Sequence, residues 1–157
     1  MKERYDVLIV GGGHAGAQAA IALRQRKFSG SIAIVGDEVD PPYERPPLSK
    51  EYLSGDKPFE RILIRPATFW REREIALLTG QVVTTVNPDA HLVQTDGGAA
   101  FGYGNLIWAA GGAPRRLACS GHDLNGVHSV RTRADVDRLM GELDLTERVC
   151  VVGLIAI

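Results

Sequence analysis

The sequence predicts an α/β fold, in which a parallel sheet begins with a βαβ unit and continues into an antiparallel β-meander. The first observation is the order of patterns in residues 5–35: an apolar strand, a glycine-rich turn, a helix of small residues and a second apolar strand. The second is a series of short β-branched or alternating runs between residues 81 and 103, separated by Asn-Pro-Asp and Asp-Gly-Gly turns. An apolar run at residues 105–110 is typical of a buried strand.

The turn after the first strand has the pattern G-x-G-x-x-G. Gly11 permits a tight turn out of the strand, Gly13 lets a pyrophosphate approach the backbone, and Gly16 lets helix and strand pack closely. The helix that follows presents unpaired N–H groups and a partial positive charge at its amino terminus. The glycine pattern alone recurs by chance in loops, but a strand before it and a helix after it make it informative.

An acidic residue follows the second strand, where a dinucleotide-binding unit places the carboxylate that accepts hydrogen bonds from a ribose. Asp37 lies 21 positions after Gly16, and Glu38 is adjacent, so either carboxylate is a candidate. Together, the turn and the acid predict a Rossmann-like domain that binds an adenine dinucleotide. The alternative is an ordinary βαβ turn whose glycines only satisfy backbone geometry.

A proline-rich loop at residues 41–50 comes next. Four prolines within residues 41–47 exclude regular helix and ladder pairing and stiffen the backbone, which favours a loop that forms part of a site. Ser49 is expected to cap a short helix that runs through Leu53 and ends at Ser54-Gly55.

The remaining elements are predicted from periodicity and turn residues. They are a short strand at 62–64, a helix at 66–74, meander strands at 81–86, 91–95 and 100–103, a buried strand at 105–110, a helix at 133–145 and a buried strand at 148–153. Trp70 and Trp108 are expected to be core aromatics.

The composition narrows the possible partners. The chain has 157 residues, enough to bury a core, and a formal net charge of −1, which favours neither nucleic acid nor an anionic membrane. It has no apolar run of about eighteen residues and no signal peptide, so no membrane span is expected. Cys119 and Cys150 lie 31 positions apart without a C-x-x-C pattern, which argues against a zinc site or a redox disulfide and fits a cytoplasmic protein.

Five segments resemble, in order and spacing, the FAD-dependent pyridine-nucleotide reductases that serve ferredoxin or rubredoxin carriers. The segments are residues 10–16, 35–38, 45–53, 109–115 and 130–132, and the most specific is the proline-rich loop that ends in Ser49-Lys50. Disulfide reductases of the same superfamily carry cysteines in this region, and this loop has none. The resemblance therefore implies electron transfer from NAD(P)H through FAD to an external carrier without a protein thiol.

The resemblance also implies roles for individual positions. The FAD pyrophosphate would be faced by Gly11, Gly13, His14, Ala15 and Gly16, and the adenosine ribose by Asp37 or Glu38. Val83 would hold the adenine through its backbone. The residues that would border the cofactor are Arg45, Ala110, Gly111, Arg115 and Arg131. Lys50 is the implied catalytic residue, because a cation near flavin N5 would stabilise the anionic reduced ring. Without the resemblance, Lys50 and Arg131 would be solvated charges and Val83 an ordinary strand residue.

Two features depart from the family. Ala110 stands where the family usually has threonine, which removes one possible hydrogen bond. Family members continue after the strand at 149–152 into a second G-x-G-x-x-G, which opens the NAD(P)H domain, whereas Gly153 is followed here by residues 154–157 without further glycine. Residues 1–115 are thus expected to be the first part of an FAD-binding domain, and residues 116–157 a linker and a truncated start of the NAD(P)H domain.

These features predict an incomplete Rossmann-like FAD-binding domain from a reductase that is truncated, frameshifted or represented only in part. The alternative to a fragment is a minimal flavin protein. Because NAD(P)H is the co-substrate of the full-length parent and its domain is missing, the chain is expected to be inactive alone. Two alternatives stay open. One is a fragment of another flavin-dependent NAD(P)H oxidoreductase, similar to apoptosis-inducing factor or monodehydroascorbate reductase; the other is a non-enzymatic nucleotide-binding module.

Overall fold

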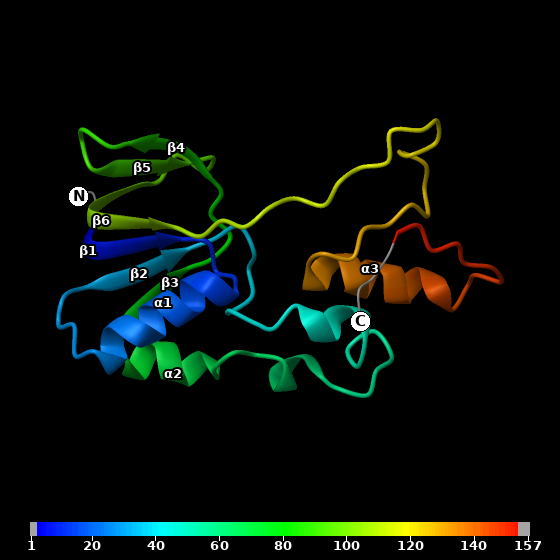
Figure 1. Ribbon diagram of the computed structural model, residues 1–157, viewed down its shortest axis with the longest axis horizontal. Coiled ribbons are helices and arrows are strands. Elements are labelled where there is room, and N and C mark those ends of the chain that lie inside the picture. Colours follow the sequence, from blue (N-terminus) through cyan, green and yellow to red (C-terminus); the bar gives the residue numbers. More distant parts are fainter. Residues whose placement is uncertain (1–2, 154–157) are drawn as a thin grey trace. The chain divides into compact units, whose positions relative to one another are not determined.

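A computed structural model of the chain describes residues 3–153, which form two compact units (Figure 1). Within these residues, the first unit, here called the sheet unit, comprises residues 3–44 and 57–112, and the second, the loop–helix unit, comprises residues 45–56 and 113–153. Each unit is described by itself. Residues 154–157, where the sequence departs from the second G-x-G-x-x-G of the family, lie outside the described part of the chain.

The sheet unit contains six strands in the order β3-β2-β1-β6-β5-β4 (Figure 1). Their bounds are β1 Glu3–Val10, β2 Ile32–Val35, β3 Ile75–Leu78, β4 Val83–Asn87, β5 Leu92–Thr95 and β6 Ala100–Trp108. β1 pairs in parallel with β2 and β6, and β2 with β3, whereas β4, β5 and β6 pair antiparallel. The parallel sheet with its βαβ start and the antiparallel meander are therefore confirmed.

β6 is one strand where two were expected, at 100–103 and 105–110. Its first half pairs with β5, and its whole length runs beside β1. Gly104, at the junction, makes this continuity possible, because a Cβ there would lie 2.7 Å from the Asp6 carbonyl oxygen of β1. A side chain at this position would push the strands apart, so the glycine marks a close approach and not a turn.

Both faces of the sheet are covered, which explains why β1 and β2 are apolar without alternation. On one face, α1 (His14–Gln25) and α2 (Ala67–Glu72) pack against side chains of the strands that include Val7 and Ile9, and Trp70 of α2 belongs to the same core. Figure 1 shows both helices on the same side of the sheet. On the other face, a second apolar core contains alternate residues of β1 and β2, which pack with Val93 and Phe101 of the meander.

The aromatic residues divide. Trp70 is 1% exposed in the core under α2, as predicted. Trp108 is 59% exposed, so its prediction as a core residue was wrong. The outer edge of residues 105–108, at the end of β6, has no strand beside it among the described residues, which leaves most of the indole exposed.

Two short elements near the proline-rich loop also differ from expectation. A 3₁₀ helix at Pro46–Ser49 replaces the helix expected from Ser49 to Leu53, because the two prolines favour a helical start there and turns follow to Gly55. The expected strand at 62–64 is a single bridge between Leu63 and Tyr43, after a 3₁₀ turn at Phe59–Arg61. The helix expected at 66–74 is confirmed as α2.

The loop–helix unit is organised by α3 (Arg133–Leu143), which confirms the expected helix. Thr132 caps it, in a capping box with Asp135. The strand expected at 148–153 was wrong: Val149, Val151 and Val152 are 63%, 74% and 68% exposed and carry no ladder pairing. An apolar run becomes a strand only when another strand supplies hydrogen bonds, and within residues 3–153 none lies beside it.

Candidate nucleotide-binding site

The turn between β1 and α1 requires two of its glycines. Gly11 has a φ of +114°, and a Cβ added to it would lie 2.2 Å from the Ala109 carbonyl oxygen. A Cβ on Gly16 would lie 2.0 Å from the Gly11 carbonyl oxygen. Side chains would therefore collide with backbone at both positions, and glycine alone permits the turn and the close helix.

Gly13 differs, because it faces open space. It is the N-cap of α1, with ordinary backbone angles, and a Cβ there would meet no described atom within 4 Å. The first backbone bond of the helix runs from the Ala17 N–H to the Gly13 carbonyl, at 3.0 Å. The N–H groups of His14, Ala15 and Gly16 precede that bond, and the first turn contains no acidic residue. The turn thus presents donors beside an open space.

The end of β2 lies against this turn. The Gly11 N–H donates to the Val35 carbonyl at 2.7 Å, and a Cβ on Gly36 would lie 3.1 Å from the Gly12 nitrogen. Of the two candidate acids that follow, Asp37 is exposed, whereas Glu38 is half-buried and accepts a hydrogen bond from the Tyr43 hydroxyl. The carboxylate of Asp37 is therefore the more accessible of the two.

Residues 80–83 extend the same edge. The Gly80 N–H donates to the Glu38 carbonyl at 3.0 Å, and the Gln81 N–H donates to the Gly36 carbonyl at 2.8 Å. Val83 then begins β4, half-buried opposite Thr95, next to a β-bulge. These bonds bring the start of the meander beside the acidic segment, at the carboxyl ends of the parallel strands, where ligands of α/β sheets bind.

The segment that follows β6 also contacts the glycine turn. The Ala109 N–H donates to the Val10 carbonyl at 2.7 Å, so the chain crosses directly over Gly11. Ala110 and Gly111 follow with exposed positions, and Gly111 has a φ of +71°. The sheet unit thus brings together the glycine turn, the acidic segment, the start of β4 and residues 109–111.

The other predicted residues belong to the loop–helix unit. Arg45 donates from Nη1 to the Arg131 carbonyl oxygen at 2.5 Å, so these two positions are in contact. Lys50 is exposed and closes the 3₁₀ turn with a 3.0 Å bond from its N–H to the Pro47 carbonyl. Arg115 is exposed in the run between residues 110 and 120.

Two tyrosine contacts, one in each unit, were not predicted. Tyr43, which binds Glu38, has no pattern in the sequence apart from its place among prolines. Tyr52 contacts Asp137 of α3 at 2.5 Å across 85 positions, a pairing that no local pattern indicates. Burial and the hydrogen bond to Asp137 raise the pKa of the Tyr52 phenol, while the nearby Arg133 opposes this shift.

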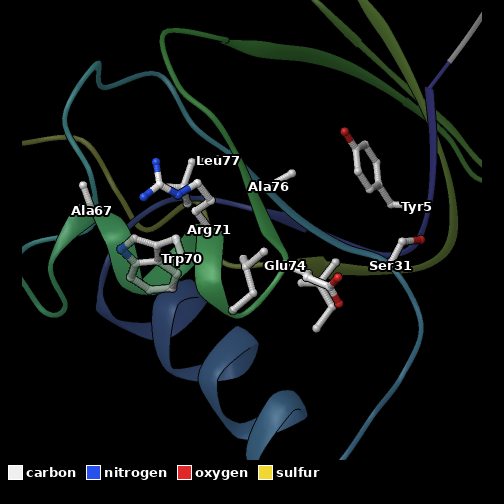
Figure 2. A pocket seen from close by; sticks show the side chains of 10 residues that line it. Tyr5, Ser31, Ala67, Trp70, Arg71, Glu74, Ala76 and Leu77 are labelled. Atoms are coloured by element: carbon white, nitrogen blue, oxygen red, sulfur yellow. The ribbon is translucent and has the colours of Figure 1, made fainter.

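A separate pocket of about 450 Å³ lies near the amino ends of the parallel strands (Figure 2). It is lined by side chains of α2, β3 and the starts of β1 and β2, among them Trp70, Arg71 and Tyr5. None of the predicted site residues lines it. Among residues 3–153, no cluster of three metal-ligating side chains occurs, and no described helix is long and apolar enough to cross a bilayer.

Two known proteins that are similar to this chain are both ferredoxin reductases. A ferredoxin–NAD(P)+ reductase of a Sphingomonas species is 60% identical over 95% of the chain. A 5,5'-dehydrodivanillate O-demethylase ferredoxin reductase subunit from a Sphingobium species is 54% identical over the same share. The chain spans only 36% of the length of each relative.

Solved structures agree with this comparison. The crystal structure of a ferredoxin reductase from Rhodopseudomonas palustris matches 88% of the chain with a TM-score of 0.82 and 33% identity, and the chain spans 34% of it. A covalent putidaredoxin reductase–putidaredoxin complex matches 90% of the chain with a TM-score of 0.80. The family model described as pyridine nucleotide-disulphide oxidoreductase matches residues 5–157, so this chain belongs to the pyridine nucleotide-disulphide oxidoreductase family.

Proposed function

We propose that this chain is the FAD-binding portion of an oxidoreductase that passes electrons from NAD(P)H through FAD to a ferredoxin or rubredoxin-type carrier. The observation that supports this most is the open space beside Gly13, next to the free donors of the first turn of α1. The relatives' names supply the carrier class, since they describe ferredoxin and rubredoxin reductases. Because the chain spans about a third of those proteins, the complete reaction is proposed for the parent protein.

The residues present fit the ADP portion of FAD, which comprises the adenine, its ribose and the pyrophosphate. A Cβ would fill the space beside Gly13, whereas glycine leaves it free for a pyrophosphate that the N–H groups of α1 can bind. The exposed carboxylate of Asp37 is suited to accept hydrogen bonds from the ribose hydroxyls. We place the adenine against the backbone of Val83, because residues 80 and 81, shortly before it, are hydrogen-bonded to the segment that carries the acid.

Lys50 would act on the other end of the cofactor. Bound FAD would take up two electrons from NAD(P)H and release them one at a time to the carrier. The protein's part would be electrostatic: the exposed ammonium group of Lys50 would favour the state in which the ring carries negative charge. Arg45, Arg115 and Arg131 add positive charge in the same unit as Lys50.

The NAD(P)H site and the carrier-docking surface are assigned to the parent protein, and we expect the isolated chain to show no turnover. The sequence holds one G-x-G-x-x-G pattern, and that pattern is assigned here to FAD. A cytoplasmic location fits the two free thiols, Cys119 and Cys150, and remains a prediction.

A ligand titration tests this proposal. FAD added to the purified chain should show quenched flavin fluorescence and a perturbed visible spectrum, and excess ADP should compete only weakly, because ADP lacks the contacts of the flavin end. If FAD leaves the spectra unchanged while ADP saturates the protein, the chain is a nucleotide-binding module and the reductase proposal is wrong.

A further inference from the structure

The loop that carries Lys50 is tied at both of its ends to one stretch of the loop–helix unit. At its start, Nη1 of Arg45 donates to the Arg131 carbonyl oxygen at 2.5 Å. Beyond its end, the Tyr52 hydroxyl donates to Oδ1 of Asp137 at 2.5 Å. These contacts join positions 86 and 85 residues apart, so they fix the loop against the helix and not merely within itself.

The second tie involves three side chains. Nε of Arg133 donates to the Tyr52 hydroxyl at 3.3 Å and also lies 3.2 Å from Oδ2 of Asp137. Arg133 and Asp137 are four residues apart, so they project from the same side of α3. The guanidinium therefore orients the carboxylate that receives the tyrosine hydroxyl.

The first turn of α3, which carries Arg133, is held in place by its cap and by burial. Thr132 and Asp135 form a capping box immediately before and within the first turn of α3. Val136, on the same turn, is fully buried, and Leu48 of the loop is 2% exposed. An anchored helix end and a buried loop residue leave little freedom to the polar contacts between them.

Lys50 lies between the two ties. Its N–H and that of Tyr52 both donate to the Pro47 carbonyl, at 3.0 and 2.9 Å, and its own carbonyl accepts from the Ser54 N–H at 2.9 Å. The backbone of Lys50 is thus fixed by neighbours that are themselves fixed, while its side chain stays exposed. A long lysine side chain can serve a single site only if its backbone is held in place.

We infer that Tyr52 and Asp137 are positioning residues, which hold the Lys50 loop on α3 so that the ammonium group meets the flavin ring. This inference rests on the proposed function, because it assumes a flavin for Lys50 to meet.

The first test needs no cofactor. Trypsin cleaves after Lys50, which is exposed in the loop, and after Lys27, which is exposed in the sheet unit and serves as the internal reference. Tyr52→Phe and Asp137→Asn should each raise the ratio of cleavage after Lys50 to cleavage after Lys27 by about fivefold, the effect of losing one hydrogen bond to a partly exposed carboxylate. Tyr5→Phe, which removes a 2.9 Å bond from a tyrosine to Glu3, is the matched control and should leave the ratio unchanged.

The second test uses the reduction potential of FAD bound at saturating concentration. Lys50→Met should shift the potential in the negative direction, and Tyr52→Phe and Asp137→Asn should give part of that shift, whereas Tyr5→Phe should give none. An unchanged cleavage ratio in both variants, or a potential that responds to Lys50→Met alone, overturns the inference and leaves the proposed function intact. Failure of the unmodified chain to bind FAD overturns the proposed function and the positioning role with it.

Discussion

At the scale of single residues, the glycines of the first turn serve different purposes. Gly11 and Gly16 are required by backbone atoms at 2.2 and 2.0 Å from where a Cβ would stand, so they are structural. Gly13 has no such neighbour within 4 Å, and its backbone angles suit any residue. At Gly13 this open space lies beside the unpaired N–H groups of the first turn of α1, and the two features together suit an anionic ligand.

The collision at Gly11 predicts a loss of stability when a side chain is added there. Gly11→Ala should lower the free energy of unfolding by about 3 kcal/mol, because it adds a collision with Ala109 to a backbone conformation that alanine rarely adopts. Urea denaturation followed by circular dichroism measures this. A loss below about 0.5 kcal/mol, the range of neutral surface substitutions, would contradict the packing described at Gly11.

At the scale of elements, β1 and the residue before β2 are locked by a reciprocal pair of side chains. The Asp6 carboxylate accepts from the Ser31 N–H at 2.7 Å and from the Ser31 hydroxyl at 2.9 Å, and the Asp6 N–H donates to that hydroxyl at 2.9 Å. The backbone bond, followed by the hydroxyl bond, lowers the pKa of Asp6 from its ordinary value of 3.8. The charged carboxylate is therefore favoured by the folded state.

A pH dependence follows from this lowered pKa. The stabilisation is present above the unfolded value, near 3.8, and is lost as the pH falls through the lower value of the folded state. Asp6→Asn should therefore be less stable than the parent chain at pH 7, and the difference should shrink below pH of about 3.5. Thermal melts of both proteins across this range would contradict the assignment if the difference were constant.

The same scale shows what the sequence could predict. The apolar strands, the helix after the glycine turn and the meander were predicted because each has its own periodicity and turn residues. The division at Gly104 and the strand at 148–153 were wrong, because whether a glycine interrupts a strand, or an apolar run pairs, depends on what lies beside it in space. The contact of Tyr52 with Asp137 was missed for the same reason, since 85 residues separate the two.

The predicted site shows a similar limit. The glycine turn, the acidic segment and residues 109–111 come together because parallel strands place their carboxyl ends on one edge. Sequence alone left Asp37 and Glu38 equivalent, and their difference arises from the hydroxyl of Tyr43, which occupies Glu38. The roles of Arg45, Lys50, Arg115 and Arg131 at a flavin remain predictions from family resemblance.

At the scale of the whole molecule, the sheet has an open edge. Residues 105–108 of β6 pair with β1 on one side, and no strand among residues 3–153 pairs with their other side. The exposed indole of Trp108 stands at the end of this edge. Unpaired strand edges with apolar side chains promote association between chains.

The purified chain should therefore self-associate as its concentration rises, and Trp108→Lys should reduce this association without loss of stability, because the side chain is 59% exposed. Sedimentation velocity over a hundredfold concentration range, of order micromolar to a hundred micromolar, measures the effect. If the unmodified chain stays monomeric over this whole range, the open edge is not a surface for association.

The most direct measurement of the central claim compares the FAD affinities of two alanine variants. Gly13→Ala adds a methyl group to the space assigned to the pyrophosphate. Gly97→Ala adds one in the turn between β5 and β6, where Oγ1 of Thr95 would lie 4.0 Å from it. Both variants should fold as the parent chain does, yet Gly13→Ala should bind FAD at least about tenfold more weakly, the effect of about 1.4 kcal/mol, while Gly97→Ala should bind it normally. Equal FAD affinities for the two variants would contradict the assignment of this turn to the cofactor.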